Sequence, residues 1–133
     1  MHPHLRLAEM KLEALEERLQ RLYANYRRRM ASLEERMRSE YNLLFEREYS
    51  NLKYIATVLA KALALVNKAK SVLSSQSEGI ARLRLQGLLS EVEELFDRVT
   101  YGHVRVPTAL RLEVFKLYKV LKEASEALTG APE

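Results

Sequence analysis

Residues 12–37 read "LEALEERLQRLYANYRRRMASLEERM", and this stretch decides the fold. Its apolar residues recur at steps of three and four, the spacing that places side chains on one side of an α-helix. Neither glycine nor proline occurs from residue 5 to residue 73. The stretch therefore predicts a long amphipathic helix with one apolar stripe. The stripe consists of Leu12, Leu15, Leu19, Leu22, Tyr26, Met30, Leu33 and Met37, and the spacing continues to Tyr41 and Leu44.

The length of this helical region predicts a break within it. A single helix over residues 5–73 would be about 100 Å long. Serine and asparagine side chains compete with a helix for backbone hydrogen bonds, so we expect the break at residues 39–42 or 50–51. The first clear stop is "SSQSEG" at residues 74–79.

Two more helices follow this stop. Residues 80–101 keep the helical spacing, and "GHVRVP" at residues 102–107 then forms a loop. Pro107 suits the first turn of a final helix at about residues 108–128. The predicted inward residues of the first of these helices are Ala81, Leu85, Leu88, Val92, Leu95 and Val99, and those of the second are Leu110, Val114, Leu117, Leu121 and Leu128.

The predicted fold is all-α, with a long N-terminal helical arm followed by a small C-terminal helical bundle. The arm covers residues 1–48, and the bundle covers residues 49–133 with helices at about 50–73, 80–101 and 108–128. The arm has no second helix beside it in sequence, and an isolated amphipathic helix is marginal in water. We therefore expect the arm to pack on another subunit.

The composition excludes several kinds of site. The chain has 133 residues, a length that fits one domain, and it has no cysteine, which excludes disulfides, thiolate metal sites and cysteine nucleophiles. The arginine, glutamate and leucine content is compatible with a thermophile. Charged residues at positions 9, 11 and 13 interrupt any signal-peptide core. The net charge of +4 says little until its placement is considered.

Residues 18–33 contain five arginines and no acid, which is the main functional signal in the sequence. At about 100° per residue, six basic residues form a stripe about a third of a turn from the apolar one, and two arginines lie on its flank. Because the guanidinium group binds phosphate with paired hydrogen bonds, we expect this surface to bind double-stranded DNA. The alternative is a solvated face that pairs with glutamates of a neighbouring chain. The stripe consists of Lys11, Arg18, Arg21, Arg28, Arg29 and Arg36, with Arg27 and Arg38 on the flank.

Residues 52–73 form a second unusual segment, rich in alanine and containing four lysines but no acid. The lysines argue against a membrane-spanning helix. We interpret the segment as the central helix of the bundle, with lysines that reach the surface. The alternative is contact with anionic lipid or with nucleic acid.

Arg98 and His103 resemble the Arg-x4-His motif of HEPN-type ribonucleases, which are also small helical bundles. That resemblance implies RNA cleavage without a metal, although Val99 stands where the family usually has a polar residue. The simpler interpretation is a loop histidine beside a helix-ending arginine. His2 and His4 are too few for a metal site, and no glycine-rich phosphate loop occurs. We therefore expect no catalytic residue, no metal and no cofactor, and a protein that is not an enzyme.

The layout of a basic helical arm and a C-terminal bundle resembles the major capsid proteins of filamentous archaeal viruses, of the rudivirus, lipothrixvirus and tristromavirus type. In that family the arm wraps double-stranded DNA, and the bundles form the wall of a helical filament. The resemblance implies a virion protein that binds DNA without sequence preference. Its further partners would be copies of itself, a related second capsid protein and, in some members, a lipid envelope. The remaining alternative is a cytoplasmic coiled-coil adaptor that binds only protein.

Overall fold

The computed structural model describes residues 3–75 and 77–129, and within them it contains helices and no strand. The predicted all-α class is confirmed. The four helices are α1 (Pro3–Ser39), α2 (Leu43–Ser75), α3 (Glu78–Tyr101) and α4 (Thr108–Thr129).

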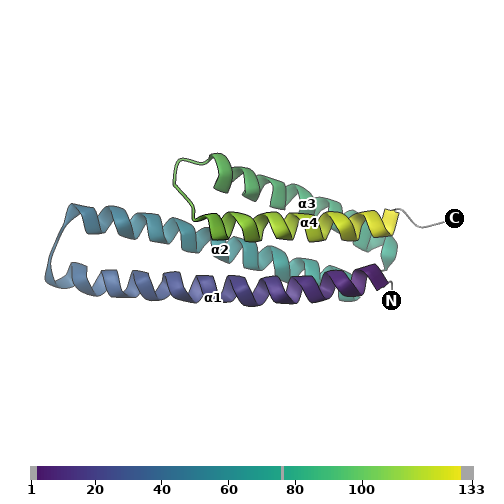
Figure 1. The fold of residues 1–133 in the computed structure, drawn as a ribbon, viewed down its shortest axis with the longest axis horizontal. Helices are drawn as coiled ribbons and strands as arrows, with labels where there is room; N and C mark the ends of the chain where they lie inside the picture. Colours follow the sequence, from purple (N-terminus) through teal and green to yellow (C-terminus); the bar gives the residue numbers. More distant parts are fainter. Residues whose placement is uncertain (1–2, 76, 130–133) are drawn as a thin grey trace.

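The helices form an up-and-down bundle in which each packs on its neighbours in sequence (Figure 1). The ring is closed by α1, which packs on α4 as well as on α2. The buried apolar side chains of all four helices form one cluster. Each fully buried leucine contributes about 1.5–3 kcal/mol through removal of apolar surface from water. The largest fully buried side chains are Leu12, Leu15, Leu19, Leu59, Leu65, Val66, Leu85, Val92, Leu95, Leu110, Leu117 and Leu121.

The predicted long N-terminal helix is present as α1, but it packs within the bundle of its own chain instead of standing apart from it. Leu12, Leu15 and Leu19 are fully buried in the cluster that α2 and α4 of the same chain share. The apolar stripe therefore does not need a second subunit to cover it. The predicted boundary at residue 48 also differs, because α2 begins at Leu43 and runs through that position without interruption.

The break between α1 and α2 lies at the first of the two predicted places. The Ser39 hydroxyl donates to the Arg36 carbonyl oxygen at 3.1 Å, where α1 ends. The Asn42 side-chain oxygen accepts from the backbone N–H of Leu44 at 2.8 Å, which caps the start of α2. The other predicted place, residues 50–51, is continuous helix.

The C-terminal end of α1 and the N-terminal end of α2 project beyond the loop that joins α3 to α4 (Figure 1). We call residues 30–50, which include this projection, the hairpin. The Tyr49 hydroxyl donates to Glu34 at 2.6 Å, and the Arg36 guanidinium lies 4.5 Å from the Phe45 ring centroid. These contacts hold the two helices together where α3 and α4 no longer support them.

The central segment of the chain is a bundle helix, as its simpler interpretation predicted. Leu59 and Val66 are fully buried, whereas Lys53, Lys61 and Lys68 are exposed on α2. Lys70 instead pairs with Glu16 of α1, with its Nζ atom 3.0 Å from the carboxylate. Among the described residues, no helix combines the length and apolarity that crossing a bilayer requires.

Candidate nucleic-acid interface

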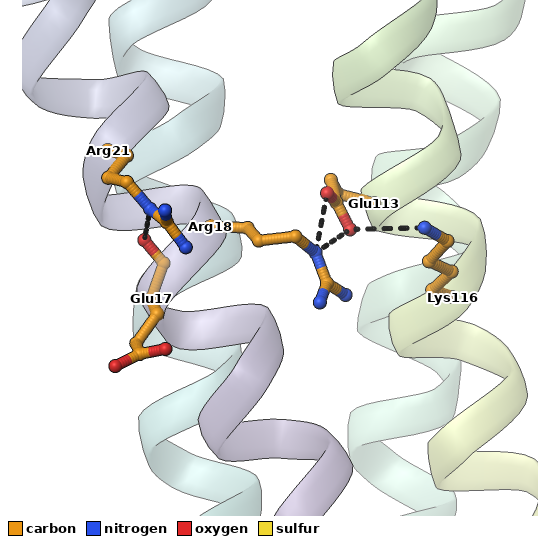
Figure 2. A network of polar contacts seen from close by, with 5 residues as sticks. All are labelled: Glu17, Arg18, Arg21, Glu113 and Lys116. Atoms are coloured by element: carbon orange, nitrogen blue, oxygen red, sulfur yellow. Dashed lines mark hydrogen bonds and ion pairs between the residues drawn. The ribbon is translucent and has the colours of Figure 1, made fainter.

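The predicted basic residues all lie on α1, but the structure divides them into two groups. Lys11 and Arg18 form the first group, because both contact carboxylates of α4. Arg18 extends from α1 toward α4, where its Nε atom donates to both carboxylate oxygens of Glu113 at 2.8 and 3.0 Å (Figure 2). Lys11 lies 3.4 Å from Glu123 in a more exposed pair.

The buried carboxylate of Glu113 explains why the Arg18 side chain extends toward α4. The residue is only 8% exposed, and a buried carboxylate is costly unless a cation and hydrogen bonds compensate it. Arg18 supplies both, while the Lys116 Nζ atom lies farther away at 3.9 Å (Figure 2). We therefore expect Arg18 to stabilise the packing of α1 on α4 rather than to bind phosphate.

The second group, which we call the arginine surface, comprises the six predicted arginines of residues 21–38. All six are exposed, and none has a carboxylate within ion-pair distance in the described part of the chain. Among the described residues, Arg21 donates only to the backbone oxygen of Glu17, at 3.5 Å (Figure 2). The members of the arginine surface are Arg21, Arg27, Arg28, Arg29, Arg36 and Arg38.

Aromatic rings position two members of this surface. The Arg29 guanidinium lies 4.9 Å from the centroid of Tyr26, and Arg36 lies over Phe45 in the same way. Stacking on a ring orients the guanidinium plane and leaves its N–H edge free for an anion. These two arginines are therefore held in place without their charge being neutralised.

Glu34 lies near the arginines but is engaged by a tyrosine. It accepts the hydroxyl hydrogen bond of Tyr49, and this bond raises the pKa of Tyr49 because it favours the protonated phenol. The positive charge of Arg27 lowers the same pKa by a smaller amount. The acid is thus occupied within the hairpin instead of pairing with an arginine.

A cavity of about 770 Å³ lies beside the arginine surface, where the loop between α3 and α4 meets α1 and α2. We call this cavity the notch. Gly102 begins its loop wall: its N–H donates to the Arg98 carbonyl oxygen at 2.9 Å, and a side chain there would collide with that oxygen. His103 lines the notch, whereas Arg98 is not among its lining residues. The notch therefore contains only one member of the predicted ribonuclease pair.

The described residues contain no group of three or more histidine, aspartate or glutamate side chains that could hold a metal ion. The predicted terminal pair, His2 and His4, lies outside the described side chains. Glu113 and the notch were not predicted from the sequence. The sequence does contain a signal for a buried Glu113. It lies three residues after Leu110, and this helical spacing places it on the inward side of the last helix.

Comparison of the chain with protein-family models, with curated proteins and with solved structures finds no match.

Proposed function

We propose that this chain is a structural protein that coats double-stranded DNA, as the repeating subunit of a helical filament, and that the arginine surface is its contact with DNA. The observation that carries the proposal is that six exposed arginines lie within residues 21–38 and that none of them forms an ion pair with a carboxylate among the described residues. Exposed arginines of ordinary solvated helices usually alternate with acids that pair with them.

The length of this surface suits a duplex. Arg38 lies 17 positions after Arg21, which corresponds to about 25 Å along the helix axis. About seven base pairs of duplex DNA have the same length. Guanidinium groups would bind backbone phosphates and would not read the bases, so we expect binding without sequence preference. Such binding releases counterions and is weakened steeply by salt.

Exposed apolar side chains support the filament part of the proposal. Tyr41, Leu43 and Leu44 lie exposed where α1 joins α2, and Ile80 and Leu83 lie exposed on α3. Contact with copies of the chain, or with a related second capsid protein, would cover them. From the resemblance to filamentous archaeal virus capsids we further propose that the protein is part of a virion, with a lipid envelope as a further partner as in some members of that family.

The test is a double substitution on the arginine surface, Arg21→Gln with Arg28→Gln. Both side chains are exposed and neither supports the core, so the variant should fold normally. We expect weaker binding to duplex DNA and a salt dependence whose slope falls by up to about 2, because each lost phosphate contact removes about 0.9.

The matched control is Arg82→Gln with Arg84→Gln, which removes the same charge from the exposed face of α3. Equal losses in the two variants would indicate a net-charge effect and would contradict a defined surface. Electron microscopy with and without DNA tests assembly: we expect filaments with DNA, and discrete small oligomers indifferent to DNA would favour the adaptor alternative.

A further inference from the structure

The notch is a site distinct from the arginine surface, with which it shares only Arg29. Its volume of about 770 Å³ lies within the range of pockets that hold small molecules. Four parts of the fold form its walls: α1, α2, the loop after α3 and the first turn of α4. One of these walls is the loop that joins α3 to α4, and α1 and α2 extend beyond this loop (Figure 1).

Positive charge converges on the notch from three separate elements. Arg29 comes from α1, Arg105 from the loop and Arg111 from α4. Glu48 is the only acid among the lining residues, and none of the three arginines forms an ion pair within residues 3–75 and 77–129. Like charges gathered around one cavity repel each other unless an anion binds between them.

The arginines of the notch are partly positioned in advance. Arg29 is stacked on Tyr26, which is itself buried, and Arg111 donates through Nη2 to the Thr108 hydroxyl at 3.3 Å. The Nε atom of Arg111 and the hydroxyl of Thr100 are buried and have no hydrogen-bond partner among the described residues. Buried polar groups are normally hydrogen-bonded, so these two groups are candidates to bind a ligand in the notch that both residues line.

The N-terminal end of α4 adds to the positive electrostatic potential in the notch. Pro107 and Thr108 line the notch, so the N-terminal end of this long helix faces it. The first N–H groups of a helix point outward and carry its positive partial charge, which favours phosphate. The helix end therefore acts together with the three arginines.

The rest of the lining suits more than a bare phosphate ion. Leu52, Ile55 and Val106 provide a buried apolar wall, and Asn51 of α2 offers an amide that can donate and accept. We propose that the notch binds the phosphate group of a nucleotide-sized ligand, with Arg29, Arg105 and Arg111 on the phosphate and the α2 wall beside the base or sugar. The nucleotide is either free or part of a nucleic-acid strand.

The experiment is calorimetric titration of the full chain with adenosine monophosphate, adenosine and inorganic phosphate. We expect the monophosphate to bind at least about tenfold more tightly than adenosine, since charge-assisted hydrogen bonds contribute that much or more. Arg105→Gln, in the exposed loop, should weaken binding of the monophosphate about tenfold. Arg84→Gln on α3 should leave it unchanged. Equal affinity for the monophosphate and adenosine, or equal effects of the two substitutions, would overturn the proposal.

The two sources of the nucleotide differ in a competition measurement. If a short DNA duplex displaces the monophosphate and Arg105→Gln weakens both, the phosphate belongs to a nucleic-acid strand. If the duplex binds without displacing it, the ligand is a free nucleotide. The Arg21→Gln/Arg28→Gln variant lies outside the notch and should bind the monophosphate normally, so failure of the proposed DNA coat and failure of the notch remain distinguishable.

Discussion

From the ion pair between Arg18 and Glu113 we predict that replacing the arginine lowers the free energy of unfolding more than replacing the glutamate does. The Glu113 side chain is 10% exposed and that of Arg18 is 38% exposed. Arg18→Met keeps the apolar stem but leaves a buried carboxylate without its main cation, so we expect the free energy of unfolding to fall by about 1–3 kcal/mol. Glu113→Gln should cost less, because water can solvate the half-exposed guanidinium. Urea denaturation measures both, and a larger loss in Glu113→Gln would contradict the assignment.

From the hydrogen bond of Tyr49 we predict that the stability of the fold depends on pH in the alkaline range. Its hydrogen bond to Glu34 raises its folded-state pKa above the ordinary value of 10.0. The protonated phenol is thus favoured by folding, and this contribution is present below that ordinary pKa and is lost as the pH rises through the folded-state pKa. Glu34→Ala should lower the pKa of Tyr49, measured by NMR titration of its ring carbons. Glu35→Ala, at the exposed neighbouring position, should leave it unchanged.

At the scale of the element, the sequence allowed a break at two places, and the structure has a helix cap at only the first of them, at the start of α2. Asn42→Ala removes the acceptor for the Leu44 N–H, so we expect a loss of about 1 kcal/mol in chemical denaturation. Ser50→Ala lies in exposed, continuous helix, where alanine is the better helix former, and it should be neutral or slightly stabilising. A loss at Ser50 equal to that at Asn42 would show that the cap is not what limits α2.

The apolar faces of single helices were predictable residue by residue. The buried residues of α3 are the six that the helical spacing placed inward, from Ala81 to Val99. Four of the five inward residues predicted for the last helix are buried, and Leu128 packs partly buried against the core. This success follows from the local nature of helical periodicity, which depends only on neighbours three and four positions away.

At the scale of the whole molecule, the packing of α1 predicts that the rest of the chain does not fold without it. In a fragment of residues 43–133, the apolar side chains of α2 and α4 that α1 covers would face water. We expect this fragment to lose the cooperative thermal transition of the full chain, as followed by circular dichroism. A fragment that still unfolds cooperatively would contradict this prediction and would support the interpretation of residues 1–48 as an arm separate from the bundle.

The same packing changes which arginines are available to a ligand. A helical wheel placed Arg18 and Arg36 in one stripe, because both lie in the same direction from the axis of α1. In the structure α4 lies beside Arg18 and supplies Glu113, whereas Arg36 lies on the hairpin, where Phe45 of α2 contacts it. The direction of a side chain was predictable, but the element that it meets was not.

The sequence by itself determined the all-α class and the inward faces of the helices, and it limited the break in the long helical region to two places, of which the structure has the first. These features depend on steric and hydrogen-bonding preferences between residues close in the chain. Only the tertiary structure decided that α1 completes the bundle, that Arg18 is neutralised by Glu113 and that Arg29, Arg105 and Arg111 surround one cavity. Those features join residues far apart in sequence, and burial of apolar surface, which has no direction of its own, brings them together only when the whole core forms.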